Sequence, residues 1–193
     1  HLISCARAFP WMEDFWRERR HGRACMVWSG QVDAKDCLAS VFPGRGPLIS
    51  PLVEDLAKLG HLPFTRADSA ALPTSAAKAA GNSNGWFDHF DKLPGGSWRA
   101  TGWAARHDRY RGPDAVLIAY QREGSNQPPV VAGVSTAPIE HRGDVQEFSA
   151  HPKIGWQAHI TPRTLPSGKL TLRAFAFTIR QQPDATGPWE ILE

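Results

Sequence analysis

The spacing of apolar residues changes at Gly85, and this change limits the available folds more than any other feature of the chain. From Gly85 onward apolar and polar residues alternate in short runs, and turn sequences rich in Gly and Pro separate these runs. Such a pattern is typical of an antiparallel β-sandwich or a small barrel. The predicted strands are Trp86–Phe90, Trp98–Ala104, Ala115–Gln121, Val130–Ser135, Ile154–Ile160 and Lys169–Ile179, with Trp189–Leu192 as a candidate last strand.

Before Gly85 the pattern is helical. Residues 8–21 place Trp11, Phe15 and Trp16 on one stripe at helical spacing, which predicts a helix. Its apolar face is expected to pack in the core or, as an alternative, to lie at a lipid interface. Residues 24–30 are expected to form a short strand or an extended link.

Two further helices are predicted in the first half. One covers Asp33–Val41, with Asp33 as its N-cap. The next begins with Ser50 as N-cap and Pro51 in the first helical position, a combination that favours a helix start. Gly60 is expected to end this helix, and its buried face is predicted to consist of Leu52, Val53, Leu56 and Leu59.

Together these patterns predict an α+β chain. A helical N-terminal segment (1–64) is followed by a linker rich in Ala, Ser, Thr, Asn and Gly (65–84). Residues 85–193 are expected to form an antiparallel β-sandwich, of jelly-roll or Ig-like type.

The three cysteines lie in the first quarter of the chain, at spacings that match no zinc-binding pattern, so no metal site is predicted. In an oxidising compartment two of them are expected to pair. Cys25–Cys37 is the preferred disulfide, because it closes a short loop and would stabilise the fold by about 3 kcal/mol. Cys5–Cys37, Cys5–Cys25 and three reduced, buried thiols are the alternatives.

Net charge and motifs limit the class of partner. The formal net charge is only +3 and most basic residues are scattered, which gives little reason to expect nucleic-acid binding. No glycine-rich phosphate loop of the Walker or dinucleotide-binding type is present, and no cofactor is predicted.

Trp86, Trp103 and Trp156 are the first candidates for a binding surface, because each follows a glycine and each falls in a predicted strand. Their indole rings are expected either to fill the core or to stack on sugar rings at a surface. Composition does not separate these two uses.

Charged residues supply the remaining candidates. Asp88 lies next to His89, but neighbours in a strand point to opposite faces, so a strand-end or bracing role is expected. Arg142 and Asp144 are two residues apart and would point the same way in an extended segment. They are expected to brace a loop or to hold a polyol or an anion.

Several segments in order resemble a known arrangement of the bacterial cell envelope. Phe42-Pro43 after a short helix, and then Leu59-Gly60-His61-Leu62, resemble a stretch that follows the last membrane span in polytopic glycosyltransferase-like and polysaccharide-assembly proteins. The β-rich half resembles the extracytoplasmic C-terminal domain of the same proteins. The segments that carry this second resemblance are Gly85-Trp86-Phe87-Asp88, Gly102-Trp103-Ala104, Val116-Leu117-Ile118, Arg142-Gly143-Asp144-Val145, Gly155-Trp156 and the strand from Gly168 through Ala174 and Ala176.

The resemblance covers about residues 30–180 and departs from the usual pattern at Phe42, where tyrosine is common, and at Gly143, where proline is common. It implies a periplasmic or outer-face location, with membrane spans upstream of His1 in the parent protein. It also implies a non-catalytic accessory domain that binds glycan or a partner protein. The alternatives are a hydrolase or transferase domain using Asp88 or Asp144, and a structural subunit that docks through Trp11–Trp16.

Overall fold

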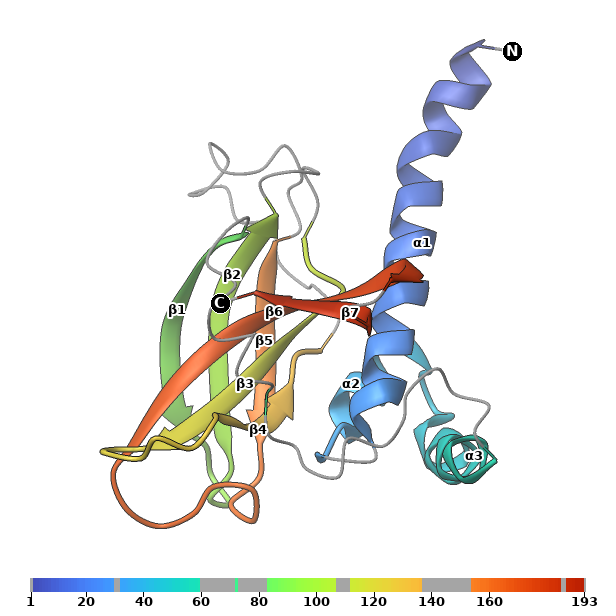
Figure 1. Ribbon diagram of the computed structural model, residues 1–193. Helices are drawn as coiled ribbons and strands as arrows, with labels where there is room; N and C mark the ends of the chain where they lie inside the picture. Colours follow the sequence, from blue (N-terminus) through green and yellow to red (C-terminus); the bar gives the residue numbers. More distant parts are fainter. Residues whose placement is uncertain are drawn as a thin grey trace.

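The structure is a computed structural model that describes residues 2–29, 32–59, 72, 83–106, 112–136, 154–184 and 187–192. In this described part of the chain, three helices precede seven strands (Figure 1). The helices are α1 (Leu2–Ser29), α2 (Lys35–Val41) and α3 (Gly46–Lys58). The strands are β1 (Ser83–Lys92), β2 (Trp98–Arg106), β3 (Ala115–Arg122), β4 (Val130–Val134), β5 (Gly155–Ile160), β6 (Leu170–Asp184) and β7 (Gly187–Leu192).

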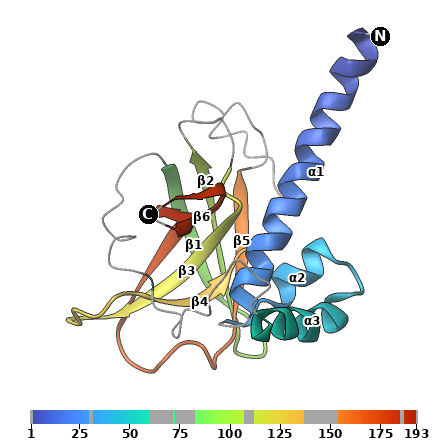
Figure 2. The same ribbon diagram turned by 45° about the vertical axis from the view of Figure 1, so that its right-hand side comes forward.

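The first helix is longer than predicted, and the short strand or extended link predicted at residues 24–30 is wrong, because the helix continues to Ser29. Helix α1 continues to Ser29, because its apolar residues keep the helical spacing: Ala24, Cys25 and Trp28 are all buried. Trp28 packs edge-on against Phe177 of β6, with ring centroids 5.8 Å apart. The end of α1 therefore belongs to the core, while its N-terminal part extends beyond the sheets (Figures 1 and 2).

The second and third helices begin at other residues than predicted. Ala34, not Asp33, is the N-cap of α2, although the Asp33 carboxylate accepts a 3.3 Å hydrogen bond from the Lys35 backbone N–H. Helix α3 starts at Gly46, so Pro51 lies inside it. Pro47, instead, falls in the first turn of α3, where the missing N–H of a proline costs little.

The prediction of the buried face of α3 is only partly correct. Val53 is buried and Leu56 is half-buried, but Leu52 and Leu59 are exposed. The buried side of α3 instead consists of Ile49, Val53 and Leu56, at spacings of four and three residues, and the opposite side faces solvent. Gly60, the expected end of this helix, lies outside the described residues.

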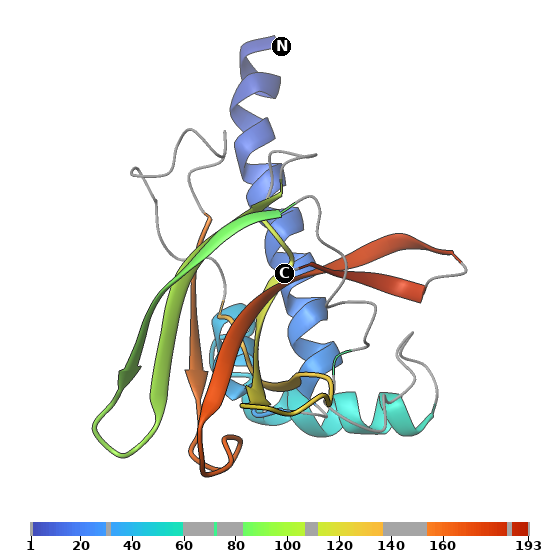
Figure 3. The same ribbon diagram turned by 60° about the vertical axis from the view of Figure 1, so that its left-hand side comes forward.

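All seven predicted strands are present, in two antiparallel sheets. The three-stranded sheet has the order β1-β2-β5, and the four-stranded sheet has the order β4-β3-β6-β7. Figure 3 shows the first sheet on one side of the second, with the helices on the far side. The sheets approach each other beside β4 and β5, where the Thr136 N–H donates a 2.8 Å hydrogen bond to the Gln157 carbonyl.

Two hydrophobic clusters fill the spaces between these layers. Between the sheets lie apolar side chains of β2, β3, β4 and β5, among them Ile118, Trp156 and Ile160. Between the second sheet and the helices lie Cys25, Trp28 and Leu38 together with Phe175 and Phe177. The helices therefore bury the outer face of the four-stranded sheet, and the two halves of the chain share one core.

The preferred disulfide is confirmed. Cys25 of α1 and Cys37 of α2 are bonded, with their Cα atoms 5.6 Å apart. The bond joins the buried end of α1 to the middle of α2. Within the linker predicted at 65–84, Leu72 is buried and its N–H donates a 2.8 Å hydrogen bond to the Pro129 carbonyl.

Candidate functional site

In β2 and β5, the glycine of each Gly-Trp pair lies opposite the tryptophan of the other pair. Gly102 is the register partner of Trp156, and Trp103 is the register partner of Gly155. A Cβ atom on Gly102 would lie 2.5 Å from Cζ2 of the Trp156 indole and would also collide with the Trp86 carbonyl oxygen. Only glycine leaves room for the ring at this position, which explains why glycine precedes tryptophan in β2.

Trp156 serves the core. Its side chain is 6% exposed, and its ring packs edge-on against Phe87 with centroids 5.5 Å apart. This contact joins β1 and β5 on the side of the sheet that faces the other sheet. Of the three tryptophans proposed from sequence, Trp156 is therefore the one whose ring is held between the sheets.

Trp86 and Trp103 lie on the opposite, outer face. They are register partners in the β1–β2 pair, and directly opposed residues point to the same side of a sheet. Their neighbours Phe87 and Gly102 form the next pair and point inward with Trp156. Trp103 is half-buried and packs near Ile154, whereas Trp86 is 68% exposed.

Polar side chains continue this outer face. Thr101, two residues before Trp103 in β2, is the register partner of His89 in β1 and of Gln157 in β5. His89 is exposed, while Thr101 and Gln157 are half-buried. Each of these side chains can donate and accept hydrogen bonds. Two indoles beside a polar row therefore define what we call the outer tryptophan face: Trp86, His89, Thr101, Trp103 and Gln157.

A cavity of about 250 Å³ lies between the two sheets, where the residues around Trp86 in β1 and Trp103 in β2 approach β3 and β6. It is smaller than the roughly 300–1,000 Å³ of typical small-molecule sites, so it can admit only a small group. It is lined by Gly85, Trp86, Phe87, Trp103, Ala104, Val116, Trp156, Leu172, Arg173, Ala174 and Ala176. All three tryptophans proposed from sequence thus border one cavity, Trp86 being the most exposed of them.

The other proposed residues do not all join this site. Asp88 falls at an irregularity of the β1–β2 register, between Phe87 and His89, and is half-buried. Bulges of this kind re-aim side chains and increase local twist. Arg142 and Asp144 lie outside the described residues, so their expected pairing stays a prediction.

Sequence reasoning missed Thr101 and Gln157. A signal for Thr101 was available, because residues two apart in a strand share a face and Thr101 precedes Trp103 by two. Gln157 could be placed only with the register of β2 and β5, which no local pattern gives.

In comparisons with known proteins, no family model, no curated protein and no solved structure matches this chain. The resemblance to glycosyltransferase-like and polysaccharide-assembly proteins therefore stays a prediction. Among the described residues, no helix combines the length and the apolar composition needed to cross a membrane.

Proposed function

We propose that this chain binds glycan through the outer tryptophan face, as an accessory module of a bacterial envelope protein. The observation that carries the proposal is the exposure of Trp86, 68%, directly opposite Trp103 on the same face of the sheet. Burying the apolar surface of an indole ring is favourable, and an exposed ring does not gain this free energy. A sugar ring stacked on Trp86 would bury part of its surface and so gain part of it.

The surroundings of Trp86 suit a hydroxyl-rich ligand. Thr101, His89 and Gln157 form a polar row across the three strands beside the two indoles. A sugar offers an apolar ring face and a rim of hydroxyl groups, and hydroxyl groups pair with side chains that both donate and accept hydrogen bonds. Trp86 and Trp103 also border the cavity between the sheets, which would admit one small substituent of such a ligand.

The disulfide supports a location outside the cytoplasm. Disulfides form and persist in oxidising compartments such as the periplasm, and they are rare in the cytosol of mesophiles. The bond between Cys25 and Cys37 is buried in the core. We also propose that the two sheets form a sandwich of jelly-roll or Ig-like type, since their shared cluster places Ile118 of one sheet with Trp156 and Ile160 of the other.

A second candidate function is docking to a partner protein as a structural subunit. Met12, Phe15 and Trp16 are exposed on α1 at helical spacing. The Arg19 guanidinium lies over the Phe15 ring, 4.9 Å from its centroid. The side chain of Trp11, which the sequence also placed here, is outside the described residues. The hydrolase or transferase alternative stays a prediction from Asp88 and Asp144.

A titration of the whole chain tests glycan binding. The ligands are soluble hexasaccharides of glucose, N-acetylglucosamine and mannose, and the readouts are tryptophan fluorescence and titration calorimetry. Binding of at least one hexasaccharide, with a saturable change in fluorescence, is expected. If none of the three hexasaccharides changes the fluorescence or gives a heat of binding, glycan binding is ruled out and partner docking remains as the candidate function.

A further inference from the structure

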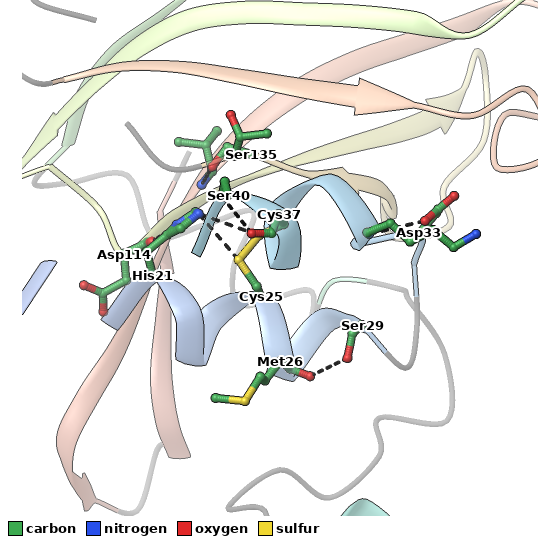
Figure 4. Close-up of a disulfide and its surroundings, with 12 residues drawn as sticks. His21, Cys25, Met26, Ser29, Asp33, Cys37, Ser40, Asp114 and Ser135 are labelled. Atoms are coloured by element: carbon green, nitrogen blue, oxygen red, sulfur yellow. Dashed lines mark hydrogen bonds between the residues drawn. A yellow bond between two sulfur atoms is a disulfide. The ribbon is translucent and has the colours of Figure 1, made fainter. Parts of the chain in front are cut away.

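A buried histidine faces the disulfide. His21, one turn before Cys25 in α1, places Nε2 3.5 Å from Sγ of Cys25 and 3.7 Å from Sγ of Cys37 (Figure 4). All three side chains are essentially inaccessible to solvent. The disulfide alone does not call for a histidine at this place, because an apolar side chain would fill the same space without the cost of burying a polar ring.

The orientation of the His21 ring is fixed from its other side. Nδ1 lies 2.7 Å from the backbone carbonyl oxygen of Asp114, and a carbonyl can only accept, so Nδ1 carries the proton and donates it. Nε2 is then unprotonated, and its lone pair points at the two sulfur atoms. Metal-binding histidines are held in the same way, with one ring nitrogen donating to a backbone carbonyl and the other binding the metal.

We propose that, when the Cys25–Cys37 disulfide is reduced, the two cysteine thiolates and Nε2 of His21 bind one thiophilic cation, Zn²⁺ or Cu⁺. The three ligand atoms already lie within 4.8 Å of one another. With Zn–S near 2.3 Å and Zn–N near 2.0 Å, a tetrahedral site places nitrogen and sulfur about 3.5 Å apart. The observed nitrogen–sulfur distances of 3.5 and 3.7 Å meet this requirement.

Burial favours the metal-binding form of the histidine. The pKa of His21 is lowered, mainly because burial disfavours the charged ring, and the hydrogen bond to the Asp114 carbonyl opposes this only in part. His21 therefore stays neutral near pH 7, as a metal ligand must. A buried site of two thiolates and one imidazole matches soft, thiophilic ions. Zn²⁺ would add a water as its fourth ligand, whereas Cu⁺ is satisfied by three ligands.

The chemistry balances with a dithiol as reductant. The dithiol gives two electrons and two protons to the Cys25 and Cys37 sulfur atoms and becomes a cyclic disulfide. The cation then replaces the two thiol protons, which leave to solvent. The same two sulfur atoms make either the disulfide or the metal bonds, so the two forms exclude each other.

The test uses the whole chain carrying Cys5→Ser, so that Cys25 and Cys37 are the only cysteines. The protein is reduced with a dithiol, freed of it by gel filtration without oxygen, and titrated with Co²⁺ as a coloured substitute for Zn²⁺. We expect one Co²⁺ per chain with the visible absorption of tetrahedral cobalt thiolate, displaced by Zn²⁺ or Cu⁺. The oxidised protein should bind none. Reduced protein without this absorption, and without competition for either ion against a chelator, would overturn the proposal.

The role of His21 is tested with His21→Gln in the same background, with Asp55→Asn as the control, because Asp55 is an exposed carboxylate of α3. Loss of a ligand should weaken metal affinity by more than about tenfold, since even outer-shell changes cost that much. Asp55→Asn should leave the affinity unchanged. Equal affinities of the two variants would show that only the thiolates bind.

A reduced chain could also bind metal after unfolding. X-ray absorption together with circular dichroism distinguishes this outcome from binding by the folded chain, and it needs no histidine variant. The zinc-loaded Cys5→Ser protein should show two sulfur neighbours and one or two nitrogen or oxygen neighbours, with native far-UV circular dichroism. A zinc shell without sulfur, or the right shell in a chain that has lost its circular dichroism, would contradict metal binding by the folded chain.

Discussion

The guanidinium of Arg20 lies 2.8 Å from a carboxylate oxygen of Asp114, across the boundary between the helical and the β-rich half of the chain. The Asp114 side chain is 4% exposed and that of Arg20 is 24% exposed. His21, the next residue of α1, bonds the backbone carbonyl of the same aspartate. Asp114, which immediately precedes β3, thus joins α1 to the sheet by two polar contacts, in addition to the packing of Trp28 on Phe177.

Arg20→Ala should destabilise the protein, because it removes a cation that lies 2.8 Å from the buried Asp114 carboxylate. The expected loss is roughly 2–4 kcal/mol in the free energy of unfolding, measured by urea denaturation. The control is Lys58→Ala, whose partner Asp55 lies at 3.2 Å but in a pair that is 67% exposed on both sides. It should change stability by less than about 0.5 kcal/mol. Equal effects of both variants would show that Arg20 does not stabilise Asp114.

Stability should fall as the solution becomes acidic, owing to His21. Burial lowers its pKa, so the unfolded chain takes up a proton near pH 6.5 whereas the folded protein does so only at lower pH. The stabilisation is therefore complete above about pH 6.5 and is lost as pH falls through the folded-state pKa. The groups that face the ring are Asp114, which is paired with Arg20, and the disulfide, which does not titrate.

The pH effect is measured as the difference in unfolding free energy between pH 7.5 and pH 5.5, for the native chain and for His21→Gln. The variant should lose less stability than the native chain over this interval, because it lacks the group that titrates. An identical loss of stability in both proteins would show that a group other than His21 causes the pH dependence.

Removing the disulfide should cost about 3 kcal/mol, since a loop of this length is no longer closed in the unfolded chain. The variant is Cys25→Ala/Cys37→Ala, measured by thermal and urea unfolding without added metal. Mass spectrometry of Cys5→Ala should still show one intramolecular disulfide. A mixture of disulfide pairings in the native chain would contradict the assignment.

Gly102→Ala should destabilise the β-rich half, because the added Cβ would meet both the Trp156 ring and the Trp86 carbonyl. Overpacking of this kind costs about 1–3 kcal/mol. Thr101→Ala, at the neighbouring position on the outer face, is the control and should cost less. A Gly102→Ala variant as stable as the native chain would mean that β2 and β5 can separate without penalty.

The strands could be predicted because successive side chains of a strand point to opposite faces, so the two faces can be separated by taking every second residue. Ala174 and Ala176 alternate with Phe175 and Phe177 in β6, so a single period of two reveals both faces. The structure places Ala174 against the cluster between the sheets and the two phenylalanines beneath the helices. The disulfide was predictable because its two cysteines are close in sequence and the bond between them closes a short loop.

The helix boundaries and the function of each tryptophan could not be predicted in the same way. Cys25 and Trp28 keep the helical spacing of α1, but a short apolar run fits a strand as well. Trp28 packs in the helical form against Phe177 of β6, about 150 residues further along the chain, and such a distant contact cannot be read from the local sequence. Trp86 and Trp156 follow glycine in similar strands, yet one is exposed and the other buried. Their difference comes from which sheet face meets the second sheet, and that depends on the register of three strands.

The affinity of Trp86→Ala for the hexasaccharide that binds most tightly tests glycan binding by the outer tryptophan face most directly. The control is Trp16→Ala, which removes an indole that is 55% exposed on α1 and is no part of the outer tryptophan face. Calorimetric titration should show affinity reduced at least about tenfold, or 1.4 kcal/mol, in Trp86→Ala and unchanged in Trp16→Ala. Native affinity in a folded Trp86→Ala protein would contradict the account.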